Sequence, residues 1–343
     1  MQRLRIGFGL SLGLLLGASL MHCSFYLPER TVCTGTADGS CKPGDLGPLP
    51  PDLAKDPNDP SVVGPYAVAT LPMPTLPPGL IDQVLLGPSD DGAGISPKES
   101  TYPLVLIAPP SGLPPTAMRQ YADRLTTHGF IVGIYQVTDQ ANHTGYRDTA
   151  LGYLNFILNN TDASIKTRVD AGHVGLMGYQ LGAKISIAMA AQNTSIGALF
   201  LIDPVDVLTA SGPLDGAATI AQLSLAAGGT IALVGEPIST AGAQPCVQSP
   251  QKGYPDFYAA AKAPALGISF GNANLGDFME GYPDPYCTAG STAPRSQTQG
   301  LTAKFATAYF QWLLKGQARQ REYLLGADFQ SDAQTANLTR TSK

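Results

Sequence analysis

The sequence predicts an α/β protein in which helices cover both faces of one mostly parallel sheet. The chain has 343 residues, of which 44% are hydrophobic and 14% are charged, and this composition excludes a coiled coil and a charge-driven disordered protein. Apolar runs of strand length alternate with segments whose apolar residues recur at helical spacing. A chain of this length can bury a large core, so we expect a single domain.

The predicted strands are short and almost entirely apolar, as expected for strands that are buried on both faces. They lie at residues 102–108, 130–135, 173–177, 196–202, 230–234 and 266–270. The predicted helices carry their apolar residues on one face. They lie at residues 116–128, 146–158, 183–191 and 300–314. Gly129 follows the first helix and is the residue type that ends helices in the left-handed conformation.

The first 22 residues have the pattern of a secretory signal peptide. Arg3 and Arg5 precede an uncharged, apolar run at 6–21. This run is short and rich in glycine for a membrane span, although an uncleaved anchor helix is the alternative interpretation. Cys23 follows and resembles the lipidated cysteine of bacterial lipoproteins, except that His22 stands where their signals carry a small residue. We therefore expect an exported protein, either a cell-envelope lipoprotein or a secreted or periplasmic one.

Residues 23–63 are polar and rich in proline, which predicts an extended tether before the domain. With Cys23 set aside for a lipid, four cysteines remain, an even number that suits disulfides in an exported protein. Proximity along the chain favours Cys33 with Cys41 and Cys246 with Cys287 among the possible pairings. The chain has no C-x-x-C motif, so a zinc ribbon is disfavoured, and we expect neither a metal nor a cofactor.

The charge distribution bears on possible partners. Lysine and arginine number 21 against 26 aspartate and glutamate residues, and no run of basic residues occurs. We therefore do not expect a nucleic-acid-binding groove. Contact with a membrane is expected only through an N-terminal lipid, and the sequence does not predict an oligomeric state.

One junction between a strand and a helix carries the clearest functional signal. The strand at 173–177 leads directly into Gly178-Tyr179-Gln180-Leu181-Gly182, and a helix follows. A Gly-x-x-x-Gly motif at such a junction is typical of a nucleophile elbow, in which two glycines let the strand and the helix approach around one strained residue. We therefore expect Gln180 to adopt a strained or left-handed backbone conformation.

Four segments, of which the elbow is one, resemble in order those of the α/β-hydrolases of the chlorophyllase, platelet-activating-factor acetylhydrolase and polyester-hydrolase group. They are Gly64-Pro65-Tyr66, Thr127-His128-Gly129-Phe130-Ile131-Val132, Gly178–Gly182 and Leu201-Ile202-Asp203-Pro204-Val205-Asp206. The resemblance implies the α/β-hydrolase fold for a domain at 64–318. Residues 319–343 are then expected to form a C-terminal tail.

The resemblance also implies a catalytic triad, and here this sequence departs from the family. Gln180 stands at the position of the serine nucleophile, and an amide has no oxygen that a base can turn into an alkoxide. Asp203 stands at the position of the acid. Asn274 or Leu275 stands at the position of the late histidine, and neither can transfer a proton near neutral pH. Without a histidine to orient, Asp203 is expected to cap the turn at Pro204.

The family's oxyanion hole is affected as well. The strand at 102–108 leads into Pro109-Pro110-Ser111, where the resemblance implies flexible backbone amides. Proline has no N–H to donate, and such a donor typically contributes ~3–4 kcal/mol to transition-state stabilisation.

The remaining histidines and serines offer few replacements. All four histidines precede the elbow; they are His22, His128, His143 and His173. We expect packing or capping roles for His128 and His173, at the ends of predicted elements, whereas His143 lies in a loop. Ser186 lies on the helix after the elbow and is not expected to act as a nucleophile.

Three functions are therefore considered. The leading hypothesis is an exported, non-catalytic protein of hydrolase fold that binds a small apolar or ester-like molecule, or a partner, in an apolar crevice. The alternatives are an active carboxylic-ester hydrolase with displaced catalytic residues and a structural surface lipoprotein. A Ser or Thr hydroxyl within hydrogen-bond reach of His143 would favour the enzyme, and a filled crevice would favour the structural role.

Overall fold

One sheet organises the part of the chain that the computed structural model describes. That part comprises residues 58–73, 75–159, 162–206, 214–226, 229–237, 252–281 and 291–343. The expected signal peptide, most of the expected tether and all five cysteines lie outside the described residues, including both predicted disulfides. Among the helices that are described, none combines the length and the apolar character that a membrane crossing requires.

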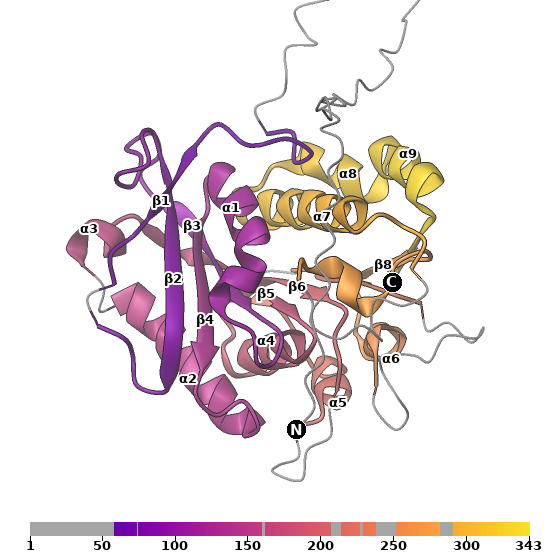
Figure 1. Ribbon diagram of the computed structural model, residues 1–343, viewed down its shortest axis with the longest axis horizontal. Helices are drawn as coiled ribbons and strands as arrows, with labels where there is room; N and C mark the ends of the chain where they lie inside the picture. The colour runs from indigo at the N-terminus through magenta and orange to yellow at the C-terminus, as the bar shows by residue number, and fades with distance from the viewer. Residues whose placement is uncertain are drawn as a thin grey trace, which may run out of the picture. The chain divides into compact units, whose positions relative to one another are not determined.

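The described strands form one mixed sheet in the order β1-β2-β4-β3-β5-β6-β7-β8-β9 (Figure 1). Strands β3 to β8 run parallel to one another, whereas β1, β2 and β9 pair antiparallel with their neighbours. The strand bounds are β1 Ala67–Thr70, β2 Leu80–Ser89, β3 Tyr102–Ala108, β4 Ile131–Val137, β5 Val169–Tyr179, β6 Ile196–Ile202, β7 Ile231–Gly235, β8 Ala265–Phe270 and β9 Leu338–Ser342. The predicted α/β class with a mostly parallel sheet is confirmed.

Helices pack on both faces of this sheet (Figure 1). Leu104 and Leu106 of β3 contribute to a core shared with α2, α4, α5 and α6, whereas Val105 and Ile107 face a second core shared with α1, α7, α8 and α9. The α-helix bounds are α1 Arg119–Thr127, α2 His143–Asn159, α3 Ala163–Lys166, α4 Leu181–Gln192, α5 Gly216–Ile220, α6 Tyr254–Ala260, α7 Arg295–Lys315, α8 Glu322–Leu325 and α9 Ala327–Ala336. Short 3₁₀ helices lie at η2 Pro115–Met118, η4 Leu275–Phe278 and η6 Ala318–Arg321.

The expectation that residues 319–343 form a C-terminal tail is wrong. These residues form most of η6, then α8, α9 and β9, and β9 completes the sheet by pairing with β8. Leu324, Phe329 and Leu338 are buried in the core beside α7. The segment looks like a tail in the sequence because few apolar residues hold it and they are widely spaced.

The expected boundary at residue 64 also lies too late. Arg124 of α1 donates a hydrogen bond to the Pro60 carbonyl (3.3 Å), and His128 Nε2 lies 3.0 Å from the Val62 carbonyl oxygen. Residues just before Gly64 therefore pack on the domain, although their composition is that of the tether.

The strand order reverses between β3 and β5. From β3 the chain moves to β4 on one side, and it returns to place β5 on the other side of β3. In open α/β sheets, ligands bind in the crevice at the carboxyl ends of the strands at such a switch point. The residues that follow β3 and β5 therefore define the place to search for a site.

Candidate functional site

The elbow lies where β5 passes into α4. Gln180 separates them with φ 52° and ψ −117°, which confirms the expected strained conformation. A Cβ atom on Gly178 would collide with the carbonyl oxygen of Gly182, and one on Gly182 would collide with the carbonyl oxygen of Ala108. The two glycines thus allow the backbone contacts that fix the turn, as the Gly-x-x-x-Gly motif predicts.

The residues on either side of Gln180 anchor the turn. The hydroxyl of Tyr179 donates a hydrogen bond to the carbonyl of Leu275, so the elbow is tied to η4 beyond β8. Leu181 is buried and starts α4. The Gln180 N–H donates to the Ile202 carbonyl at the end of β6 (3.0 Å). The elbow is therefore a rigid frame, and the partly exposed side chain that it presents is an amide.

The loop after β3 lacks the backbone donors of an oxyanion hole. Pro109 and Pro110 have no N–H. Two residues further on, the Gly112 N–H donates to the side-chain oxygen of Gln140 (2.6 Å), and the Ser111 hydroxyl donates to the same oxygen (3.0 Å). Gln140 follows β4 and was not singled out by the sequence. It occupies a donor that this loop would otherwise offer to a ligand.

Asp203 lies directly after β6, with φ 40° and with its N–H bonded to the Val234 carbonyl (2.7 Å). It is 1% exposed, and neither carboxylate oxygen has a hydrogen-bond partner among the residues that the structure describes. The expected capping of the turn at Pro204 is therefore wrong. Burial raises the pKa of this carboxyl well above its usual range, and the nearby Glu236 carboxylate adds to the shift. The Glu236 N–H opposes the shift without reaching hydrogen-bonding geometry.

Glu236 is the site residue that sequence reasoning missed. It lies directly after β7, next to the end of β6, and its Oε2 accepts a hydrogen bond from the Leu275 N–H (3.1 Å). Burial raises its pKa to about 7; the Leu275 N–H opposes this rise and Asp277 adds to it. A carboxylate directly after a buried parallel strand is a signal that could have identified it.

Asn274 and Leu275 have structural roles at the position of the late histidine. The side chain of Asn274 accepts a hydrogen bond from the Leu275 N–H (2.8 Å), and Asp277 accepts one from the Asn274 N–H (2.8 Å). These two bonds form a capping box at the start of η4, with Asn274 as the N-cap and Asp277 as the third helical residue. Arg295 lies 3.6 Å from Asp277. The residues that replace a histidine here are thus explained by the helix that they start.

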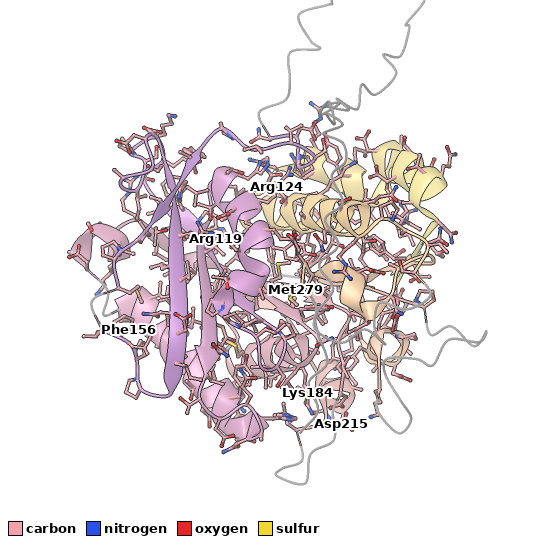
Figure 2. All side chains as sticks on the ribbon, in the orientation of Figure 1. Arg119, Arg124, Phe156, Lys184, Asp215 and Met279 are labelled. Atoms are coloured by element: carbon pink, nitrogen blue, oxygen red, sulfur yellow. The ribbon has the colours of Figure 1, made fainter. Side chains whose placement is uncertain are left out.

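A second group of charges lies on the α2, α4 and α5 side. Lys184 Nζ and Asp206 Oδ1 are 2.5 Å apart, and their side chains are 1% and 0% exposed. The Gly216 N–H donates to the other carboxylate oxygen of Asp206 (3.0 Å). Figure 2 shows Lys184 on α4 near Asp215, the residue that precedes α5. This group is a buried ion pair in which the charge of Asp206 is compensated, although its Oδ1 lies outside hydrogen-bonding geometry.

His143 begins α2 beside this ion pair. Its ring is buried and its Nδ1 has no hydrogen-bond partner. Burial lowers its pKa, and Lys184 lowers it further. No Ser or Thr hydroxyl is hydrogen-bonded to this ring in the described part of the chain. Ser186 donates to the Gly182 carbonyl within α4 (2.9 Å), so the displaced-enzyme hypothesis finds no support here.

The other two described histidines are packing and surface residues. His128 is buried, with Nε2 against the Val62 carbonyl and Nδ1 3.2 Å from the Gln311 amide nitrogen, so the proton is assigned to Nε2. Burial lowers its pKa to about 4. At the surface, His173 Nδ1 lies 2.8 Å from Asp170 Oδ2, within hydrogen-bonding distance. Neither lies at the carboxyl ends of the strands.

A cavity in the described part of the chain lies away from the elbow. It measures about 460 Å³ and lies between α4 and α5, and no elbow residue lines it. Its lining includes Ala190, Thr194, Asp215, Thr219, Gln222 and Ser224. Within the described ranges, no group of three or more His, Cys, Asp or Glu side chains is arranged to hold a metal ion.

Comparison of the chain with known protein families and with curated proteins found no match.

Proposed function

We propose that this chain is a non-hydrolytic binding protein with an α/β-hydrolase fold, and that its ligand site is the carboxyl edge of the sheet around Gln180. The observation that carries the proposal is the elbow itself. Gly178 and Gly182 hold Gln180 at φ 52°, a conformation that strains a residue with a side chain, yet the residue held there has no nucleophilic oxygen. The four segments that resemble the chlorophyllase-like group support the fold.

Three further features argue against ester hydrolysis by this route. Asn274 caps η4 and cannot relay a proton. Pro109 and Pro110 lack donors for an oxyanion, and the Gly112 N–H is bonded to Gln140. Each loss reduces a different contribution to catalysis, so together they remove the nucleophile, the base and much of the electrostatic stabilisation.

Binding is favoured over a purely structural role by the strain at this edge. Among the described residues, Gln180, Asp203 and Asn337 are the non-glycine residues with positive φ. Gln180 and Asp203 follow the adjacent strands β5 and β6, and β5 borders the switch point of the sheet. Strained residues cluster at ligand sites because the strain has to be maintained against a more stable alternative. The N-terminal pattern supports export, with Cys23 as the point of lipid attachment.

Hydrolysis of p-nitrophenyl butyrate by the purified protein tests this proposal. We expect no turnover above buffer from the wild type or from Gln180→Ser, because a lone serine has no base. Two double variants add a base: Gln180→Ser with Asn274→His, and Gln180→Ser with Leu275→His. Each is expected to give weak turnover at best, since each missing oxyanion donor costs ~10²–10³ in rate.

Robust turnover by the wild type contradicts the proposal. If that turnover survives Gln180→Ala, the chemistry is located elsewhere in the chain. If Gln180→Ala abolishes it, the amide has a catalytic role that this account does not contain.

A further inference from the structure

Two strained residues at the carboxyl edge form one connected unit. The Gln180 N–H donates to Ile202, the residue before Asp203, and the Val205 N–H lies 3.4 Å from the Gln180 carbonyl oxygen. The turns after β5 and β6 therefore support each other's positive φ values. Such mutual support is needed where a fold maintains strain at a functional site.

The Asp203 side chain is the least satisfied polar group of this unit. It is 1% exposed and both of its oxygens lack partners. A buried carboxyl without hydrogen bonds carries a desolvation cost that native structures rarely tolerate without a reason, such as an absent ion or ligand. The described residues supply no donor to Asp203, so a bound molecule that carries N–H groups would satisfy it.

The surroundings of Asp203 determine the charge of that molecule. Glu236 is coupled to Asp203 electrostatically, and Asp277 lies close enough to Glu236 to raise its pKa. The described cations nearby are committed elsewhere, since Arg295 lies 3.6 Å from Asp277 and Lys184 is paired with Asp206. The edge over β6 and β7 thus combines two acidic groups with unsatisfied acceptors, and a cation that carries N–H groups would satisfy the acceptors and stabilise the ionised carboxylates.

We propose that Asp203 and Glu236 bind the ammonium group of a small organic amine at this edge, beside Gln180. This inference rests on the proposed function and names the ligand class for the same site. Glu236 is partly exposed, whereas Asp203 is not, so the amine reaches the pair from the side of Glu236.

Binding of an amine is linked to pH through the protons that it displaces. The titratable and charged groups around the pair are Asp203, Glu236, Asp277, Arg295 and Tyr254. Burial raises the pKa of Glu236 to about 7, so this carboxyl holds a proton below that pH and loses it above. An ammonium ion has to displace this proton and the proton that burial favours on Asp203, so its affinity rises as the pH increases from 6 to 8.

Isothermal titration calorimetry with n-butylammonium chloride tests the proposal at pH 6, 7 and 8 and constant ionic strength. n-Butanol and sodium butyrate serve as neutral and anionic probes of similar length, and magnesium chloride serves as the inorganic cation. We expect binding of n-butylammonium alone, with an affinity at least about tenfold higher at pH 8 than at pH 6.

Matched variants locate the site. Asp203→Asn and Glu236→Gln preserve shape and remove a charge, and each is expected to weaken n-butylammonium binding at least about tenfold. Asp215→Asn is the control, because Asp215 accepts from the Ala218 N–H and pairs with Lys252 and is therefore already satisfied. Circular dichroism spectra establish that each variant is folded before titration.

Several outcomes overturn the inference: no binding of n-butylammonium at pH 8, equal binding of n-butanol or butyrate, selective binding of magnesium, or unchanged affinity in Asp203→Asn. None of these outcomes contradicts the proposal of a non-hydrolytic protein, which the ester assay tests separately. Turnover of p-nitrophenyl butyrate by the wild type contradicts the proposed function instead, whatever the amine does.

Discussion

Asp203 and Asp206 follow the same strand, three positions apart, and both are buried, but they have opposite surroundings. Asp206 contacts Lys184 at 2.5 Å and accepts the Gly216 N–H at 3.0 Å. Asp203 has no hydrogen-bond partner on either carboxylate oxygen and faces a second carboxyl, that of Glu236. The chain therefore satisfies a buried charge on the α4 side of this turn and leaves one unsatisfied on the β7 side.

The comparison separates two kinds of buried charge. A satisfied ion pair joins elements, and here it joins α4 to the turn after β6 and to the start of α5. An unsatisfied carboxyl joins nothing and costs stability, so its presence needs a function outside the fold. The difference assigns a structural role to the Lys184 side of the edge and a binding role to the Glu236 side.

The largest expected effect comes from breaking the satisfied pair. Asp206→Asn leaves the Lys184 charge buried without a counter-ion and should lower the free energy of unfolding by ~3–5 kcal/mol. Asp203→Asn should change it by less than ~1 kcal/mol, because no bond is lost and asparagine also tolerates positive φ. Urea unfolding at pH 7 measures both. Equal destabilisation by the two variants would remove the distinction between the two aspartates.

A second test sharpens the role of the elbow as a frame. Gly182→Ala places a Cβ against the Ala108 carbonyl oxygen, and we expect destabilisation of ~1–3 kcal/mol or more. Gly152→Ala is the matched control, because a Cβ there meets nothing within 4 Å on α2. It should stabilise the protein by ~0.5–1 kcal/mol. If thermal and urea unfolding show that Gly182→Ala is tolerated as well as Gly152→Ala, the close packing of β3 and α4 is not what holds Gln180.

A smaller effect is expected from the pH dependence of stability. The pKa of Glu236 is raised from 4.5 to about 7 in the folded protein, so the folded state holds the proton more tightly than the unfolded state. Its contribution to the free energy of unfolding therefore falls as the pH rises from 4.5 to about 7. Between pH 4.5 and about 7, the free energy of unfolding of Glu236→Gln should therefore rise by on the order of 2 kcal/mol relative to that of the wild type.

The contribution of His128 to the free energy of unfolding changes with pH in the opposite direction to that of Glu236. For this reason the stability of Glu236→Gln is compared with that of the wild type at each pH. Burial lowers the pKa of His128 from 6.5 to about 4, so its contribution to stability rises with pH between those values. Subtracting the wild-type curve from that of Glu236→Gln removes this common contribution. A difference that stays flat from pH 4.5 to 8 contradicts the raised pKa of Glu236.

The sequence predicted the parts of this edge that depend on local pattern. The apolar runs located strands β3 to β8, and the spacing of Gly178 and Gly182 located the strained Gln180, because steric demands of a tight turn act over a few residues. Asp203 was identified as a site residue, but its lack of partners depends on which residues of other strands surround it. No local pattern contains that information.

The parts that were missed are held by long-range contacts. Glu236 and Gln140 lie after strands far along the chain from the residues they contact, Leu275 and Gly112. Strand β9 has a polar sequence and is fixed by pairing with β8 at the edge of the sheet. Such pairings depend on topology, which the sequence pattern specifies for β3 to β8 but not for a polar edge strand.

The protonation state of Asp203 tests the account most directly. Infrared difference spectra between the wild type and Asp203→Asn at pH 6, well above the usual pKa of an aspartate, should contain the C=O band of a protonated carboxylic acid, because burial without described partners raises the pKa of Asp203. Asp215→Asn should leave that band unchanged, since the Ala218 N–H lowers the pKa of Asp215. We predict that saturating n-butylammonium removes the band as the carboxyl ionises. An ionised Asp203 at pH 6 without any amine would contradict the claim that this carboxyl lacks a partner.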